Sequence, residues 1–332
     1  DKIREIVESC KPSQVKFKTL PSLLEIVDGK VGITQIREIE IDDLLKRSPK
    51  DLDQKLIESL VAGKSVLITG AGGSIGSELS RQVAQCSPSV EILVDNSEYG
   101  LYRIDSELSA NNNDVKLHSI LENIISPIKT EDHLRRIEAD IIFHSAAYKH
   151  VSLVETNPCG AIINNILGTV NAAKLADNYK VKKFIMVSTD KAVRPTSVMG
   201  ATKRVCELFI QNFNHISDTD YVAVRFGNVL DSSGSVIPKF RQQIMNGGPV
   251  TVTHPEATRY FMLIPEAVQL VMQAASLGKG GEIFILDMGE PVNIDNMAKD
   301  MIRMMGFGLE EVKIDYTGLR PGEKLQIGRA HV

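Results

Sequence analysis

Short runs of apolar residues alternate with helical patterns through the middle of this chain. The apolar runs lie at 65–69, 90–95, 115–118, 140–144, 183–188 and 221–226, and a helical pattern fills 74–85. Apolar runs separated by helices are typical of parallel strands that are buried on both faces. We therefore predict an α/β fold, a Rossmann-type doubly wound parallel sheet that binds ligands at the carboxyl ends of its strands.

The rhythm changes after Asn228. Proline, glycine and short mixed elements appear there, followed by a predicted helix at 265–277, a strand at 282–286 and a helix at 293–305. We predict a Rossmann domain over 64–230 and a smaller C-terminal substrate-binding lobe over 231–326. The residues before 64 do not follow the Rossmann pattern, and they indicate the tail of a preceding domain and a connecting arm.

Composition narrows the class of function. The chain has 332 residues and a net charge of −4, without a basic block, which argues against nucleic acid as a partner. No apolar run approaches the roughly 20 residues of a membrane helix. The four cysteines are scattered along the chain, so we expect reduced thiols. The histidines His144, His150 and His254 lack metal-ligand spacing, so we expect no metal.

A glycine-rich turn links the first predicted strand to the first helix. Glycines at 70, 73 and 76 allow a tight turn and a close approach to a pyrophosphate, which the first helical residues, Ser74 and Ile75, then face. Asp95 follows Gly76 by 19 residues, where a carboxylate can bind ribose hydroxyls. Because no Lys or Arg lies between Asp95 and Arg103, we expect NAD rather than NADP as the cofactor.

The segments 188–191 and 199–203 have the layout of a short-chain dehydrogenase active site with one substitution. Met199 stands where a catalytic tyrosine is expected, and Lys203 lies four residues further, on the same helix face. A thioether cannot exchange a proton at working pH. Proton transfer is therefore expected of Thr189, Asp190 and Lys191.

These segments occur with several others that together are specific. The further motifs are Ala146–Val151, Asn165–Thr169, Arg225–Asn228, Thr258–Tyr260 and Gly318–Lys324. With them the chain resembles the CapD-like polysaccharide-biosynthesis family of extended short-chain dehydrogenases. The resemblance is to the large, membrane-anchored nucleotide-sugar 4,6-dehydratases of that family, in which a methionine replaces the catalytic tyrosine, as Met199 does here.

The resemblance implies an organisation for both ends of the chain. Residues 1–35 are expected to be the tail of a degenerate nucleotide-binding-like domain, and residues 36–63 a connecting arm. Residues 327–332 match a translated sequencing adapter, so we expect a non-native tail. The family further implies a cytoplasmic catalytic fragment of a membrane-anchored protein, a UDP-sugar substrate, and a homo-oligomer.

The resemblance also implies residue roles. Asp190 would protonate the C6 hydroxyl, Lys191 would remove the C5 proton, and Thr189 would bond the C4 oxygen. Lys203 would bond the nicotinamide ribose, and Met199 would pack against sugar or nicotinamide. The loop residues expected at the cofactor are Ala146, Ala147 and Tyr148, and the residues expected at the substrate are Lys149, Asn228, Ser235, Arg259, Arg320 and Glu323.

Two other functions stay open at this point. A nucleotide-sugar epimerase shares C4 oxidation but has no C6 leaving group to protonate, so the Asp190–Lys191 pair favours dehydration of a UDP-N-acetylglucosamine-type sugar. A non-catalytic NAD-binding sensor would explain the missing tyrosine. The presence of Thr189, Asp190, Lys191 and Lys203 argues against a sensor. The group that deprotonates the C4 hydroxyl is not identified by the sequence.

Overall fold

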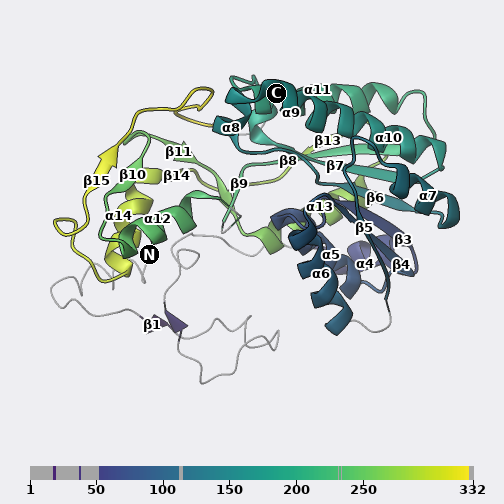
Figure 1. Ribbon diagram of the computed structural model, residues 1–332, viewed down its shortest axis with the longest axis horizontal. Coiled ribbons are helices and arrows are strands. Elements are labelled where there is room, and N and C mark those ends of the chain that lie inside the picture. The colour runs from purple at the N-terminus through teal and green to yellow at the C-terminus, as the bar shows by residue number, and fades with distance from the viewer. Residues whose placement is uncertain are drawn as a thin grey trace. The chain divides into compact units, whose positions relative to one another are not determined.

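The computed structural model describes residues 18–19, 37–38, 52–111, 115–230, 232 and 234–328 (Figure 1). Among them, a larger unit comprises 52–232, 260–290 and 320–328, and a smaller unit comprises 18–19, 37–38, 234–259 and 291–319. The sequence also predicts a helix at 2–10, which lies outside the described residues. The short strands β1 (Lys18–Thr19) and β2 (Arg37–Glu38) form a two-stranded antiparallel pair. Within the described parts, no helix combines the length and apolarity needed to cross a membrane.

The larger unit is built on a seven-stranded parallel sheet with the order β13-β8-β7-β6-β3-β4-β5. Its strands are β3 (Ser65–Thr69), β4 (Val90–Asp95), β5 (Lys116–Leu121), β6 (Ile141–His144), β7 (Lys183–Thr189), β8 (Asp220–Phe226) and β13 (Ile283–Ile285). The strand order reverses between β3 and β6, which is where open α/β sheets bind ligands. The predicted Rossmann-type sheet is confirmed.

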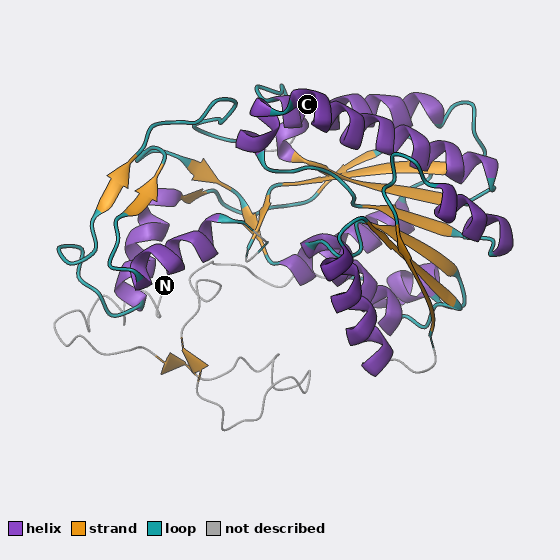
Figure 2. Cartoon of the chain, in the orientation of Figure 1, coloured by secondary structure: helices purple, strands orange, loops and turns teal. Residues whose placement is uncertain are grey.

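Helices cover both faces of this sheet (Figure 2). They are α4 (Gln54–Val61), α5 (Ser74–Gln85), α6 (Glu98–Asn111), α7 (Ile128–Arg136), α8 (Val151–Thr156), α9 (Pro158–Ala161), the π-helix η2 (Ile162–Leu167), α10 (Gly168–Asn178), the 3₁₀ turn η3 (Asp190–Ala192), α11 (Val198–Phe213) and α13 (Ile264–Leu277). Alternate residues of the strands feed two apolar cores. Val66 and Leu93 pack on the side of α5, α6 and α13, whereas Leu67 and Ile92 pack on the side of α10 and α11.

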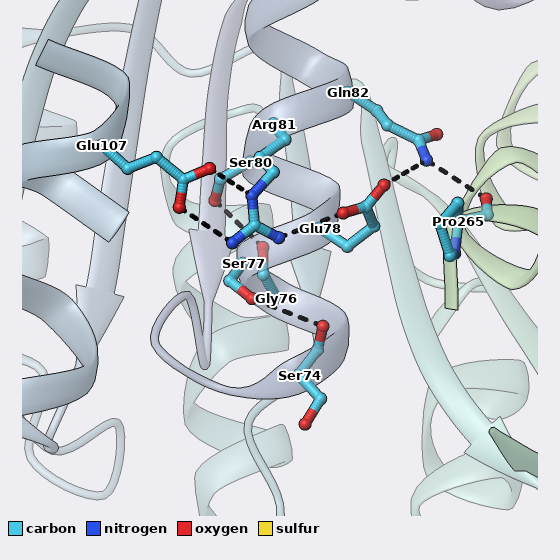
Figure 3. Close-up of polar contacts among 9 residues, drawn as sticks. All are labelled: Ser74, Gly76, Ser77, Glu78, Ser80, Arg81, Gln82, Glu107 and Pro265. Atoms are coloured by element: carbon cyan, nitrogen blue, oxygen red, sulfur yellow. Dashed lines mark hydrogen bonds and ion pairs between the residues drawn. The ribbon is translucent and has the colours of Figure 1, made fainter. Parts of the chain in front are cut away.

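A polar network fixes α5 against its neighbours (Figure 3). Arg81 of α5 donates to both carboxylate oxygens of Glu107 on α6, at 2.5 and 2.9 Å, and also donates to Glu78 at 3.0 Å. Gln82 donates to Glu78 at 2.8 Å and to the carbonyl of Pro265 in α13 at 3.1 Å. Because α5 begins directly after the glycine turn, this network also fixes the position of that turn.

Besides β1 and β2, the described residues of the smaller unit form two short sheets and two helices. Strand β10 (Val250–Val252) pairs in parallel with β15 (Ile314–Tyr316), and β11 (Thr258–Arg259) pairs antiparallel with β14 (Val292–Asn293). Its helices are α12 (Val236–Met245) and α14 (Ile294–Met304).

The stretch predicted as one lobe, 231–326, is divided between the two units. The strand predicted at 282–286 is β13, which extends the main sheet beside β8, and α13 packs against α4 and α5. Likewise β12 (Phe261–Met262) pairs in parallel with β9 (Asn228–Val229). Because of these backbone hydrogen bonds and this helix packing, residues 260–290 belong to the larger unit.

Candidate active site

The glycine turn between β3 and α5 is shaped by close backbone contacts. Gly70 has φ +72°, and a Cβ there would lie 2.7 Å from the amide nitrogen of Ala146. A Cβ on Gly76 would collide with the carbonyl oxygen of Gly70. The N-cap residue of α5 is Gly73, which has no side chain, so no N-cap side chain covers the start of the helix. This arrangement fits a dinucleotide pyrophosphate.

Asp95 at the end of β4 holds the turn to α6. Its Oδ2 accepts a hydrogen bond from the Gly72 amide, and its Oδ1 accepts one from the Ser97 amide, both at 2.8 Å. Gly72 lies directly against α6, since a Cβ on it would come within 2.6 Å of the Gly100 carbonyl carbon. Gly100 was not identified from the sequence, although a glycine five residues after Asp95 is a signal for close packing at this turn.

Replacing Gly72 with alanine should weaken NAD binding by about tenfold or more, because the new methyl group must displace backbone rather than a flexible side chain. Titration of the protein with NAD by calorimetry measures the effect, and far-UV circular dichroism verifies folding. Gly160→Ala is the matched control, because nothing lies within 4 Å of a Cβ at that position. Wild-type affinity in Gly72→Ala would show that this contact does not shape the cofactor site.

The loop after β6, with Ala146, Ala147, Tyr148 and Lys149, is held by one asparagine. Asn165 accepts from the Tyr148 amide at 2.7 Å and donates to the Tyr148 carbonyl at 3.1 Å. It also donates to the hydroxyl of Thr202 on α11 at 3.0 Å. Two adjacent asparagines, Asn164 and Asn165, inside an otherwise apolar helical segment predict that one of them bonds the backbone of a neighbouring loop, and Asn165 does so. Tyr148 and Lys149 are exposed.

His144 lies at the switch point of the sheet and is completely buried. Its Nδ1 is 2.8 Å from the hydroxyl of Thr69, and its Nε2 is 3.0 Å from the hydroxyl of Thr169. Thr169 donates its own proton to the Asn165 carbonyl at 2.7 Å, so Nε2 carries the imidazole proton and Nδ1 accepts. Burial, aided by the charge of Lys203, lowers the pKa of His144 to about 3. A neutral structural histidine results.

Thr189, Asp190 and Lys191 meet at the carboxyl end of β7. Asp190 Oδ1 accepts from the Thr189 hydroxyl at 2.9 Å and from Lys191 Nζ at 3.0 Å. Lys191 Nζ also donates to Asn228 Oδ1 at 2.9 Å, a contact not anticipated from the sequence. Asp190 is 4% exposed, and its Oδ2 has no hydrogen-bond partner among the described residues. One buried carboxyl oxygen is therefore available for proton exchange.

Helix α11 presents Met199 and Lys203 from the same face. The Met199 side chain is buried in an apolar cluster with Val154 of α8 and Ala161 of α9. Lys203 is 6% exposed, and burial lowers its pKa despite the nearby Cys206 and Glu207. The thioether takes part in packing, whereas Lys203 brings an ionisable group to this face.

Glu207, also on α11, joins three elements at one carboxylate. It accepts from Ser188 Oγ on β7 at 2.6 Å and from Arg225 on β8 through two bonds of 2.7 Å. Arg204 adds a bond of 3.1 Å. Burial would raise the pKa of Glu207, but the hydrogen bonds from Arg225 and Ser188 outweigh it and hold that pKa below its usual value. Glu207 was missed, although its spacing of four from Lys203 placed it on the inward face. An arginine within the apolar strand 221–226 predicts a structural role, and Arg225 has one, since it joins β8 to α11 through Glu207.

The predicted substrate residues fall in both units. Arg320 and Glu323 form a turn in the larger unit, in which the Glu323 carboxylate accepts from the Arg320 amide at 3.2 Å. In the smaller unit Ser235 is the residue before α12, and Arg259 is buried in β11 with a bond to the Thr258 carbonyl at 2.7 Å. Their contact with a substrate stays a prediction.

The sequence of residues 66–327 matches the family model described as "Polysaccharide biosynthesis protein". The chain belongs to this family. Its sheet order, glycine turn and β7 residues agree with the extended short-chain dehydrogenase fold that the motifs predicted.

The chain is similar to three proteins that have names of their own. It is 47% identical over 326 residues to capsular polysaccharide biosynthesis protein CapD of Staphylococcus aureus, covering 98% of the chain and 54% of CapD. It is 32% identical over 268 residues to UDP-glucose 4-epimerase of Rickettsia typhi, covering 79% and 76%. The X-ray structure of Pen from Bacillus thuringiensis superposes with a TM-score of 0.74 at 36% identity, covering 80% and 82%. The chain thus spans about half the length of CapD.

Proposed function

We propose that this polysaccharide biosynthesis protein is an NAD-dependent nucleotide-sugar 4,6-dehydratase acting on UDP-N-acetylglucosamine or a close UDP-N-acetylhexosamine. The observation that carries the proposal is the pair of the buried Asp190 and the half-buried Lys191 beside Thr189, at the end of a Rossmann strand. Elimination needs an acid for the leaving hydroxyl and a base for a carbon-bound proton. This pair offers one group for each task.

The cofactor site fits NAD, which supplies a reversible hydride acceptor when bound. The glycine turn would hold the pyrophosphate, and Asp95 would hold the adenosine ribose in addition to its two backbone bonds. Lys203 reaches the site from α11 as a buried cation and would bond the nicotinamide ribose. The asparagine-supported loop at Tyr148 would limit the other side of the cofactor.

A single proton transfer within the Asp190–Lys191 pair would give the protonation states that elimination needs. In the ion pair, Lys191 Nζ donates to Asp190 across 3.0 Å. Moving that proton to the carboxylate gives a neutral amine and a carboxylic acid, and exclusion of water by a substrate favours the uncharged forms.

With a 4-keto sugar in place, the Lys191 amine would take the C5 proton. Asp190 would give its proton to the C6 hydroxyl as the C6–O bond breaks, so that water leaves and a C5–C6 double bond forms. Thr189 would bond the C4 oxygen. Lys191 would return its proton to C5, and the proton that the C4 hydroxyl releases in the oxidation would restore the Asp190 acid, so that the protons balance over the cycle.

Incubation of the protein with UDP-N-acetylglucosamine and NAD in deuterated water tests the proposal. We expect a product that has lost one water, carries deuterium at C5 and is a 4-keto-6-deoxy sugar, as read by mass spectrometry and NMR. No net NADH should accumulate, because the hydride returns to C6. A product of unchanged mass with inverted C4 would contradict dehydration.

That second outcome defines the alternative, a nucleotide-sugar 4-epimerase. The similarity to the Rickettsia typhi protein of that name favours it. An epimerase needs no acid at C6, so it gives no task to a buried carboxyl such as Asp190. We therefore rank dehydration first.

A further inference from the structure

We propose that residues 320–324 hold the proton-transfer residues in position, and that Lys324 is the positioning residue of this segment. The inference rests on the proposed function, since it names a further residue that serves the same site. Nothing in the chemistry of elimination requires Lys324 itself. Its place follows from three contacts that the segment makes with the loop 193–197.

The first contact fixes the start of that loop. Lys324 Nζ donates to the carbonyl of Val193 at 2.8 Å, and the amide of Val193 donates to the carbonyl of Asp190 at 3.2 Å. Val193 therefore ends the 3₁₀ turn that contains Asp190 and Lys191. Lys324 holds the backbone immediately after the acid and base.

Two further contacts fix the end of the loop. Thr196 Oγ1 donates to the Gly322 carbonyl at 3.4 Å. Gly322 has φ +75°, and a Cβ there would lie 2.8 Å from Glu155 Oε1 and 2.9 Å from Ser197 Cβ. Glu155 Oε1 in turn accepts from the Val198 amide at 2.6 Å, at the first residue of α11. The segment thus also lies against the start of the helix that carries Met199 and Lys203.

The loop between these contacts joins the acid–base pair to α11. Because residues 320–324 contact it at both ends, they set the spacing between η3 and the helix. The ammonium of Lys324 is half-buried, and burial lowers its pKa; the charge of Asp190 opposes this effect, whereas those of Lys191 and Arg194 add to it. Lys324 therefore lies within electrostatic reach of the pair it positions.

The segment also begins at a residue with an expected ligand. Arg320 suits diphosphate recognition, because a guanidinium can bond two phosphate oxygens. The Glu323 carboxylate closes the turn on the Arg320 amide, so Arg320 and Lys324 belong to one turn.

The test replaces Lys324 in the NAD-loaded full chain. Lys324→Met removes the donor but keeps the aliphatic length, and it should lower kcat for dehydration by about tenfold or more with KM for the UDP-sugar and NAD content unchanged. Lys324→Arg restores a donor and should recover kcat to within about threefold of wild type. The matched control is Lys180→Met, because Lys180 is an exposed lysine with its side chain 74% accessible.

Amide hydrogen exchange without substrate separates this inference from the proposed function. Residues 193–198 should exchange faster in Lys324→Met than in wild type, and at the wild-type rate in Lys324→Arg. A wild-type protein that gives no dehydrated sugar would refute the proposed function, while the exchange result would still decide whether Lys324 holds the loop. Unchanged exchange, wild-type kcat, loss of NAD, or a change confined to KM in Lys324→Met would each overturn the positioning role.

Discussion

Asp190→Asn and Lys191→Met should each lower the rate of dehydration by about a hundredfold to ten-thousandfold, the range that a positioned acid or base contributes. The asparagine side chain keeps an oxygen that can accept hydrogen bonds from Thr189 and Lys191, but its amide group cannot act as an acid. Methionine keeps the length of Lys191 without a basic nitrogen. Both variants should retain NAD, because the hydrogen bonds found for these side chains in the described parts of the chain do not involve the glycine turn.

A surface ion pair supplies the matched controls. Lys180 and Asp218 are 4.0 Å apart, with side chains 74% and 96% exposed. Lys180→Met and Asp218→Asn make the same chemical changes where burial is absent, and we expect wild-type rates from them. Single-turnover assays with the C5 exchange of deuterium as the readout separate loss of the base from loss of the acid. Either active-site variant working within about threefold of wild type would remove that residue from the mechanism.

Glu91→Met should make the larger unit more stable at pH 7 by about 3 kcal/mol, the second large effect we expect. Glu91 lies on β4, between β3 and the edge strand β5, and is fully buried, in register with Val66 and Leu117. Neither of its carboxyl oxygens has a hydrogen-bond partner among the described residues. Burial raises the pKa of Glu91 to about 8, with a small opposing effect from the Ser80 hydroxyl.

The direction of the pH dependence follows from this raised pKa. Below pH 4.5 both the folded and the unfolded chain hold the Glu91 proton, so the group costs nothing through ionisation. Between pH 4.5 and about 8 only the unfolded chain releases it, and stability falls by about 1.4 kcal/mol per pH unit. His144 acts in the opposite direction below pH 6.5, since its pKa is lowered to about 3. The Glu91 slope is therefore unopposed by His144 between pH 6.5 and 8.

Urea unfolding at several pH values in that window measures the effect. The chain has no tryptophan, so far-UV circular dichroism is the signal. Glu91→Met and Glu91→Gln should both flatten the slope, with a smaller gain for the amide because its buried polar atoms still lack partners. Glu138→Gln, at an exposed position, should leave the slope as in wild type. An unchanged slope in Glu91→Met would mean that Glu91 is ionised in the folded state.

The sheet and the glycine turn were predictable because each depends on local patterns. Strands such as Lys183–Thr189 contain a continuous apolar run, here 184–187, and a glycine that faces backbone can be replaced by nothing larger. The helix predicted at 74–85 and the strand predicted at 90–95 begin and end at the same residues in the structure. Asp190 and Lys191 were found because they follow a strand end.

Other features depend on pairings between distant residues and carry no local signal. Strand β13 joins the main sheet through β8, more than fifty residues earlier in the chain, and only its pairing assigns it to the larger unit. The contact of Lys324 with Val193 spans 131 residues. Glu91 resembles a polar residue on an exposed strand face until the helices that cover it are placed.

The carboxylate of Glu207 has a consequence for protein engineering. Ser188 of β7 donates to Oε1, Arg204 of α11 donates to Oε2, and Arg225 of β8 donates to both oxygens. Grafting residues 188–191 alone onto another Rossmann scaffold would leave Ser188 without its acceptor and the acid–base pair without support. The smallest transferable unit of this active site therefore includes Glu207 and Arg225, which would have to be exchanged together.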